Sequence, residues 1–299
     1  MIDLIEKFRD EVVKTNSLQR RVLDIAVNNL NPTNRAMLVA YIEYCLEVGT
    51  SLQYLASSYD LIVKDTLSNQ VYFQRHGKYK HTTYSEVANS VYNNKDYMNK
   101  YMHGLALSAF LWANHAQMLN FFRDEIPRTK SGKYLEIGPG HGFFMMEAMR
   151  LSHYDSFLGV DISETSVNLT KSILNSSKFG KFKNFEIICS DFLAWNNEDK
   201  FDAIVMGEVL EHVESPKAFL HKIRSLSKSD GYIYLTTAIN APAVDHIYLF
   251  NSSAEVTDMI ESCGFIIKKL LLIPYLDKTI EESEKLKLPM NISIVLSVA

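Results

Sequence analysis

The sequence predicts an α/β fold in which a seven-stranded, mostly parallel sheet follows a mainly helical N-terminal extension. Three observations lead to this prediction. A short apolar run at 133–137 is followed at once by glycines at alternate positions. From there to residue 299, apolar segments of strand length alternate with helical ones, which is typical of a doubly wound sheet. Residues 1–127 instead show the apolar periodicity of helices.

The strands are expected in short runs that are rich in β-branched and aromatic residues. We place them at 133–137, 156–161, 185–189, 201–206, 232–236, 265–272 and 292–297. Pro216 and Gly264 mark a helix start and a helix end between strands, because proline suits the first turn and glycine the residue after the last. The charged segment 277–287 predicts a solvated loop or a short helix.

The extension is expected to contain several helices and one hairpin. The helices are predicted at 1–30, 33–46, 51–56, 84–92 and 96–122. Residues 71–81 alternate around Gly77 and predict the hairpin. A polar connector at 127–132 contains a proline and a glycine, so we expect a helical domain at 1–127 and a sheet domain at 128–299.

The glycine-rich stretch is the strongest indication of function. Glu136 lies in the first strand, and Gly138, Gly140 and Gly142 follow at alternate positions. A dinucleotide-binding loop would need glycine at 143, where the chain has Phe143. The pattern E-x-G-x-G-x-G instead resembles motif I of class I, Rossmann-like methyltransferases that use S-adenosylmethionine (SAM). Glycine allows the close backbone approach and the unusual dihedral angles that such a loop needs.

The resemblance covers residues 133 to about 299 and implies where SAM is held. Asp161 ends the second strand about twenty residues after the glycines, where an acid takes both ribose hydroxyls. By resemblance, Glu136 accepts a hydrogen bond from the cofactor's ammonium, Asp191 receives the adenine amino group, and Phe192 packs on or bonds the ring. The predicted cofactor-binding residues are Glu136, Gly138, Gly140, Asp161, Ile162, Asp191 and Phe192. The resemblance also implies that the seventh strand runs antiparallel to the others.

Candidate acceptor chemistry follows the fourth strand. Glu208, Glu211 and His212 stand at i, i+3 and i+4 and would share one face of a helical turn. The pattern E-x-x-E-H resembles the metal-ligand motif of ubiquinone-biosynthesis O-methyltransferases and of small-RNA 2′-O-methyltransferases. The second group adds a histidine downstream, and His246, after the fifth strand, would take its place as a fourth ligand. These four residues are therefore a candidate site for a divalent metal ion. The alternative is a site without metal, in which Glu208 or His212 is a base or substrate anchor, or in which the glutamate only bonds the chain locally.

Tyrosine and histidine are dense between residues 72 and 115. Such rings wall a pocket over a sulfonium, because a cation is attracted to ring faces, or they pack the extension against the sheet domain. We expect Tyr101 and His103 to face the substrate and to be candidate catalytic residues together with Glu208 and His212.

Composition limits the function classes. The net charge is −4 and no basic face is apparent, so we expect no nucleic-acid partner. The three cysteines are far apart and predict free thiols in a reducing compartment. Neither a secretion signal nor a membrane-spanning run is apparent. We expect a cytoplasmic protein with a small-molecule substrate, no membrane partner, and a possible homodimer through its extension.

The sequence thus predicts a SAM-dependent methyltransferase for a small-molecule acceptor, acting in biosynthesis, with the extension as a lid or dimer surface. Two alternatives share the fold. One is an enzyme that uses SAM itself as substrate and cyclises it with release of methylthioadenosine. The other is a non-catalytic SAM-binding or partner protein.

Overall fold

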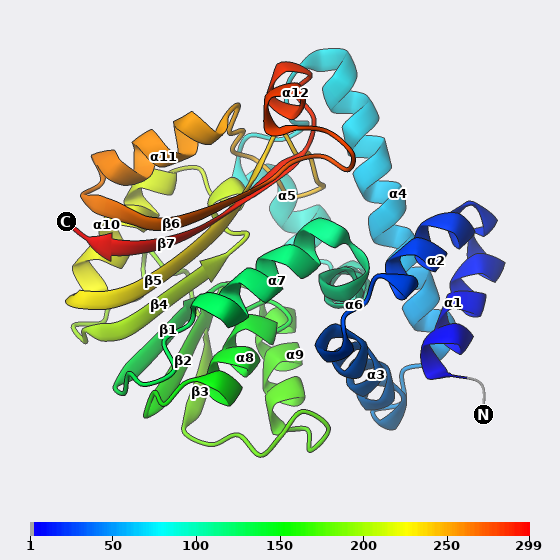
Figure 1. Cartoon of the computed structure of the whole chain (residues 1–299), viewed down its shortest axis with the longest axis horizontal. Helices are drawn as coiled ribbons and strands as arrows, with labels where there is room; N and C mark the ends of the chain where they lie inside the picture. Colours follow the sequence, from blue (N-terminus) through cyan, green and yellow to red (C-terminus); the bar gives the residue numbers. More distant parts are fainter. Residues whose placement is uncertain (1–2) are drawn as a thin grey trace.

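A twisted seven-stranded sheet forms the centre of the C-terminal part of the chain (Figure 1). The computed structural model describes residues 3–299. The strands are β1 (Lys133–Ile137), β2 (Ser156–Asp161), β3 (Phe185–Cys189), β4 (Phe201–Gly207), β5 (Ser227–Ile239), β6 (Phe265–Ile273) and β7 (Met290–Val298). Their order is β3-β2-β1-β4-β5-β7-β6, and only β7 runs against its neighbours. The fold class and the antiparallel last strand are therefore confirmed.

Helices cover both faces of this sheet. On one face lie α7 (Ala113–Glu125), α8 (Phe143–Leu151) and α9 (Glu164–Asn175), and on the other α10 (Pro216–Leu226) and α11 (Ser253–Ser262). Side chains of a strand point alternately to the two faces. In β1, Tyr134 accordingly joins the core under the first set of helices, whereas Leu135 and Ile137 join the core under the second. The short α12 (Ile280–Lys285) lies in the expected charged segment.

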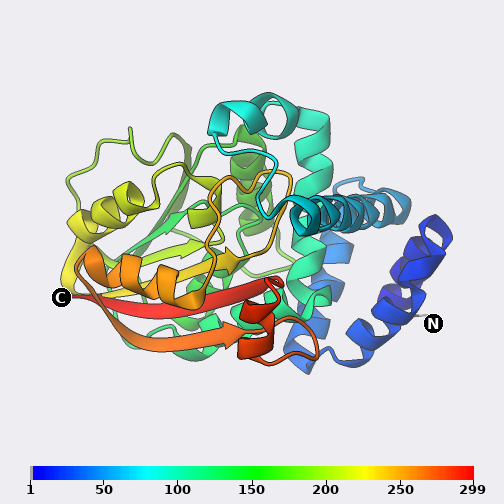
Figure 2. The same ribbon diagram turned by 90° about the horizontal axis from the view of Figure 1, so that it is seen from above.

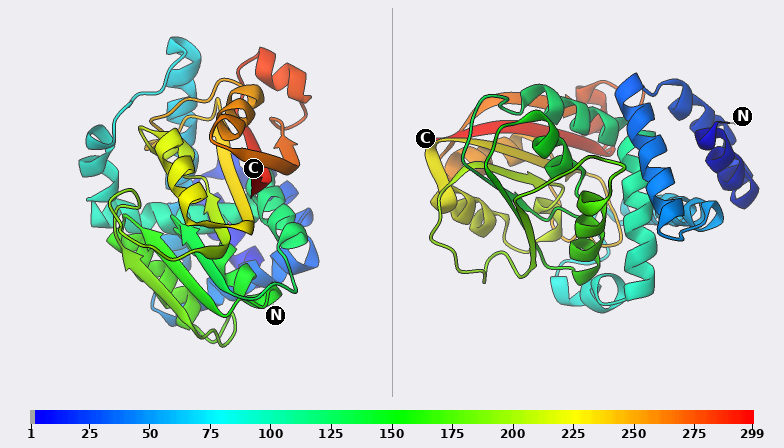
Figure 3. Two further views of the ribbon diagram at one scale, coloured as in Figure 1. Left: turned by 90° about the vertical axis from the view of Figure 1, so that its left-hand side faces the viewer. Right: turned by 90° about the horizontal axis from the view of Figure 1, so that it is seen from below.

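The extension lies at the opposite end of the molecule from the C-terminus (Figures 2 and 3). It consists of α1 (Leu4–Thr15), α2 (Arg20–Asn28), α3 (Pro32–Glu47), α4 (Leu52–His76), α5 (Tyr84–Val87), a π-helical turn (Ala88–Tyr92) and α6 (Lys95–Leu111). Helix α6 packs against α3 and α4 of the extension and also against α7 and α9 of the layer on the sheet. It is therefore one of the elements that join the extension to the sheet domain.

Four predictions in the extension were wrong. The helix expected at 1–30, whose first two residues lie outside the described part, is interrupted because the Asn16 side chain caps a new turn by accepting from Leu18 N. The helix expected to end at 56 continues to His76 and replaces the hairpin; Gly77 is its left-handed C-terminal cap rather than a hairpin turn. The helix expected at 96–122 breaks at Trp112, whose backbone is extended.

Helix α7 precedes the expected domain boundary but packs on the sheet. The hydroxyl of Tyr234 in β5 donates to the carbonyl of Met118 in α7 at 2.9 Å. The division at 127/128 stays a prediction, and this packing favours a boundary nearer residue 112. Across residues 3–299, no helix is both long and apolar enough to span a membrane.

Candidate active site

The glycine loop lies where the strand order reverses, between β1 and β4, which is the usual ligand site of such sheets. Gly138, Gly140 and Gly142 have φ values of 64°, 57° and 76°, a left-handed backbone that other residues rarely adopt. A Cβ atom on Gly138 would lie 2.7 Å from Val209 Cγ2. The loop therefore needs glycine for its backbone conformation and, at Gly138, for the close approach of the segment after β4.

Asp161 lies at the tip of β2 and faces this loop. Its Oδ2 accepts from Gly140 N at 3.1 Å and its Oδ1 from Ser163 N at 2.8 Å. The carboxylate is buried, which raises its pKa, whereas the two backbone bonds oppose that rise. Each oxygen keeps a lone pair for a ribose hydroxyl. The next residue, Ile162, is 45% exposed and presents an apolar surface beside the acid.

The adenine end of the predicted site differs from the expectation in one respect. Asp191 is exposed, and its Oδ1 accepts from Leu193 N at 2.8 Å. The ring of Phe192 is buried, with its centroid 5.3 Å from that of Phe219. The expected packing of the Phe192 ring on adenine thus has no support in this geometry, because the ring is already part of the core. Its backbone remains at the site.

Glu136 is almost completely buried beneath the loop. Its Oε2 accepts from the Tyr134 hydroxyl at 2.5 Å. Burial raises the pKa of Glu136 to about 8, because the charged form loses its hydration. A cofactor ammonium nearby would favour the ionised form, so this residue is suited to the role that the resemblance implies.

Two buried carboxyl groups follow β4. Glu208 has φ 52°, a strained conformation for a residue with a side chain, and its Oε2 accepts from Asn291 Nδ2 at 2.8 Å. Glu211 lies in the short 3₁₀ turn Leu210–His212, and its Oε2 accepts from Thr237 Oγ1 at 2.7 Å. Because Glu208 precedes this turn, the expected single helical face was wrong.

Burial, together with the charge of the other carboxyl group, raises the pKa of Glu211, and burial likewise raises that of Glu208. The second oxygen of each carboxyl group, Oε1, has no hydrogen-bond partner within residues 3–299. The two groups are therefore suited to retain a proton between them and to accept a donor from a bound molecule.

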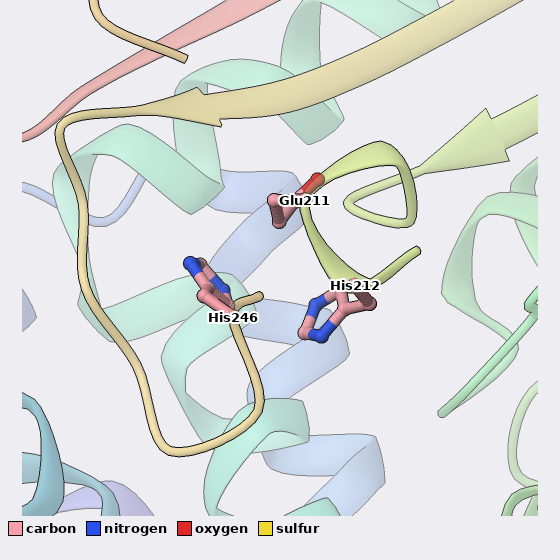
Figure 4. A group of neighbouring side chains, drawn as sticks. All are labelled: Glu211, His212 and His246. Carbon is pink, nitrogen blue, oxygen red and sulfur yellow. The ribbon is translucent and has the colours of Figure 1, made fainter. Parts of the chain in front are cut away.

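Two histidines lie beside Glu211 (Figure 4). Ligand atoms of Glu211, His212 and His246 all lie within 4.8 Å of one another. The backbone N–H groups of Ile247 and Tyr248 donate to the Glu211 carbonyl at 2.9 Å, which holds the loop after β5 against the 3₁₀ turn. Burial, with the nearby His212 as a further cause, lowers the pKa of His246 to about 3, so its imidazole is neutral.

This donor set fits a divalent metal ion in part. A carboxylate and two imidazoles are ligands that zinc and other transition metals accept. Nδ1 of His246 lies 2.6 Å from the carbonyl of Ala241, the kind of contact that orients a metal-binding histidine. Glu208, the fourth predicted ligand, is outside the group of three and is held by Asn291.

Tyr101 and His103 lie in different environments although both are on α6. The Tyr101 hydroxyl donates to Asp245 Oδ1 at 3.1 Å, beside His212. Nδ1 of His103 lies 2.7 Å from the Tyr41 hydroxyl, and the ring lines a separate cavity of about 410 Å³ with residues of the α3–α4 connection and Asn99. The structure thus brings Tyr101, but not His103, to the cluster after β4 and β5.

Sequence reasoning missed two residues of this cluster. Asp245 is buried, and its Oδ2 accepts from the Tyr92 hydroxyl at 3.2 Å. Neither residue belongs to a recognisable motif, and the contact joins positions that are 153 residues apart. The only signal was general: Tyr92 belongs to the tyrosine-rich segment, and Asp245 precedes His246.

Comparison with known families agrees with this geometry. A methyltransferase domain family model matches residues 112–270. Among curated proteins, a mitochondrial ubiquinone biosynthesis O-methyltransferase of Candida albicans is 30% identical over 38% of this chain and 35% of its own length. The enzyme of the same name from Leptothrix cholodnii is 26% identical over 42% of this chain and 52% of its own length. The chain thus matches between a third and about half of each of these relatives.

Solved structures share the fold. One is a chain from the complex between the Haloferax volcanii Trm112 methyltransferase activator and a putative methyltransferase. Its TM-score is 0.53 at 13% identity, over 68% of this chain and 96% of that chain. The [4+2]-cyclase SpnF has a TM-score of 0.50 at 12% identity, over 62% of this chain and 80% of its own. With the family match and the glycine loop, these findings show that the chain belongs to the class I, SAM-dependent methyltransferase family.

Proposed function

We propose that the chain transfers the methyl group of SAM to a hydroxyl group of a small molecule. The observation that carries the proposal is the cluster of buried acids and histidines after β4 and β5, which lies against the cofactor loop. Val209 stands between Glu208 and Glu211 and closely approaches Gly138. An acceptor bound at the cluster is therefore next to the loop that the family uses for SAM. The name shared by the relatives, O-methyltransferase, supports a hydroxyl acceptor.

Methyl transfer is an in-line displacement at a carbon that the positive sulfur already activates. The protein's tasks are to align the acceptor, to exclude water and to take the hydroxyl proton. The free Oε1 atoms of Glu208 and Glu211 are placed to accept from the hydroxyl, and His212 is the alternative base. Tyr101 and the neighbouring aromatic rings would close the site. His103 is proposed only to support α6.

A divalent metal ion is a further part of the proposal. Glu211, His212 and His246 would hold it, and a bound ion would lower the pKa of an acceptor hydroxyl. We expect a chelator to abolish turnover with SAM affinity nearly unchanged, and Glu211→Gln to have the same effect. Glu208→Gln is the matched control for metal content, because Glu208 lies outside the group of three. Full activity after chelation, with no metal found by elemental analysis, would rule the ion out.

The test of the proposed function is incubation with methyl-labelled SAM and a panel of small phenolic and aliphatic hydroxyl compounds. S-adenosylhomocysteine and a labelled methyl ether are the expected products. Methylthioadenosine without an acceptor would instead indicate that SAM itself is the substrate. Binding of SAM without either product from any acceptor would indicate a sensor or partner subunit. The cytoplasmic location and the homodimer stay predictions.

A further inference from the structure

Residues 84–95 of the extension pass over the end of β1 that carries the glycine loop. At the start of this segment, Tyr84 N donates to Glu214 Oε1, beyond the turn after β4, at 2.8 Å. At its end, Lys95 Nζ lies 3.0 Å from Oε2 of Glu164, the first residue of α9 after β2. Strand β1 lies between β2 and β4 in the sheet. A segment attached behind both neighbouring strands therefore crosses the end of β1.

Packing holds this segment in place along its length. Val87 and Val91 are buried in the core that the extension shares with the sheet domain. The π-helical turn packs on α6. The ring of Tyr84 stacks on that of Tyr92, with centroids 5.5 Å apart and an interplanar angle of 25°. The position of the Tyr84 ring is thus defined by the fold before any ligand binds.

The ring of Tyr84 lies near the end of β3, where the adenine of SAM is predicted. Burial, followed by the charges of Asp191 and Cys189, raises the pKa of its hydroxyl, which indicates that the ring is near both residues. Cys189 ends β3, and its thiol donates to the Ile162 carbonyl at 3.6 Å, so the ends of β2 and β3 are adjacent. Ile162 and Leu193 are 45% and 40% exposed, which leaves two apolar surfaces uncovered beside Asp191.

An adenine bound there requires a flat partner, because bases stack on aromatic rings. The resemblance gave this role to Phe192, but the Phe192 ring is buried against Phe219. The next ring along the chain, that of Trp195, packs toward Phe192 and has Lys222 Nζ 5.8 Å from its centroid. Both rings after β3 are therefore engaged elsewhere, whereas Tyr84 approaches the same strand end from the extension.

We propose that Tyr84 is a cofactor-binding residue whose ring stacks on the adenine of SAM, opposite the exposed side chain of Ile162. Tyr84 lies outside residues 112–270, which match the family model, so this contact belongs to the extension of this chain. The ring makes the contact, and the hydroxyl is not required. The inference rests on the family's use of SAM and on the predicted adenine position, and it is independent of the hydroxyl acceptor proposed above.

The test combines variants of Tyr84 with ligands that lack one part of SAM. S-adenosylhomocysteine carries adenine and the amino acid, methylthioadenosine lacks the amino acid, and S-ribosylhomocysteine lacks adenine. Titration calorimetry measures the tight Kd values and ligand-observed NMR the weak ones, for the native chain, Tyr84→Leu and Tyr84→Phe. Tyr72→Leu is the matched control, since Tyr72 also stacks within the extension, on His76 of its own helix with centroids 4.1 Å apart.

We expect Tyr84→Leu to raise the Kd of S-adenosylhomocysteine and of methylthioadenosine roughly tenfold, within the range for loss of a ring that stacks on a base. The Kd of S-ribosylhomocysteine should not change. Tyr84→Phe and Tyr72→Leu should bind all three ligands as the native chain does. An equal loss for all three ligands in Tyr84→Leu, a loss for none of them, or a loss in Tyr84→Phe as large as in Tyr84→Leu would each overturn the proposal.

This inference and the proposed function fail separately. Every measurement is of binding, so a chain that forms no methyl ether can still lose adenine affinity when Tyr84 is replaced. Conversely, a chain that forms methyl ethers, and whose Tyr84→Leu variant binds S-adenosylhomocysteine as tightly as the native chain, retains the proposed function and loses this inference.

Discussion

At the scale of single residues, the site is built from acids that stand at strand ends. Asp161 shows how: its two oxygens are fixed by backbone N–H groups of the glycine loop and of the following turn. A carboxylate held in this way is already oriented before any ligand binds, which would reduce the cost of ordering it on binding.

Asp161→Ala should therefore weaken SAM binding by about 1.5–3 kcal/mol, the range for a hydrogen bond to a charged group. Titration calorimetry measures the change. Asp155→Ala is the control, because Asp155 precedes the same strand at its other end. Equal SAM affinity in the native chain and the Asp161 variant would show that the proposed cofactor register is wrong.

A second prediction concerns replacement of Glu136, which should raise the free energy of unfolding but weaken SAM binding. Below pH 4.5 its carboxyl group is protonated in both the folded and the unfolded chain. Between pH 4.5 and about 8 it is ionised only in the unfolded chain, so folding loses stability as the pH rises. Glu136→Gln removes that loss and keeps an acceptor for Tyr134.

We expect the Gln variant without SAM to be more stable than the native chain at pH 8, by about 3–5 kcal/mol at most, and equally stable near pH 4. SAM binding should be weaker in the same variant, because the ammonium loses its carboxylate. Denaturant melts at both pH values and a SAM titration measure the two effects. A variant with lower stability at pH 8 would contradict the assignment of Glu136 as a protonated buried acid.

At the scale of elements, a buried ion pair joins three helices. Arg123 of α7 donates from Nη2 to Glu147 Oε1 of α8 at 2.9 Å, and from Nη1 to Asn34 of α3. Both charged side chains are less than a tenth exposed. Removal of one partner leaves a buried charge that is only partly compensated by Arg150, 3.6 Å from the same oxygen.

Arg123→Met should consequently lower the free energy of unfolding by about 3 kcal/mol, near the low end for a broken buried pair. The double variant Arg123→Met/Glu147→Met should recover much of that loss, because no buried charge then remains; Arg150, which also loses Glu147, is 40% exposed. Urea unfolding of the single and double variants measures the difference. A single variant within 1 kcal/mol of the native chain would mean that Arg150 replaces Arg123 fully.

The elements also show what the sequence could predict. Strands such as 133–137 and 156–161 were placed to the residue, because apolar runs bounded by turn residues leave few alternatives. The hairpin around Gly77 was predicted wrongly, because glycine suits the end of a helix and the turn of a hairpin equally well. In the candidate site, acids were predicted from their positions at strand ends. Asp245 and Tyr92 were not, because only the tertiary fold brings them together.

At the scale of the whole molecule, the extension and the sheet domain share one hydrophobic core. A continuous cluster of buried residues extends from Ile5 of α1 to Val295 of β7. Phe143, which follows the cofactor loop, contacts Tyr41 of α3 and Phe110 of α6, with ring centroids 5.6 and 5.1 Å apart. Such a core favours cooperative unfolding of both parts.

The two tryptophans of the chain test this prediction, since Trp112 lies beside the extension and Trp195 in the sheet domain. Trp195→Phe leaves Trp112 as the fluorescent probe, and Trp112→Phe leaves Trp195. In each variant, tryptophan fluorescence and circular dichroism should give the same midpoint of unfolding in urea. A tryptophan transition that precedes the loss of helix signal would instead indicate two independently stable parts.

The contacts of Phe143 have a consequence for protein engineering. A chimera that carries this extension on the catalytic domain of another methyltransferase would place Tyr41 and Phe110 against a foreign loop. The glycine loop would then contact side chains that do not fit it, even though every residue of its motif had been retained. To transfer a substrate preference between enzymes of this architecture, Phe143 should therefore be transferred together with the helices that contact it.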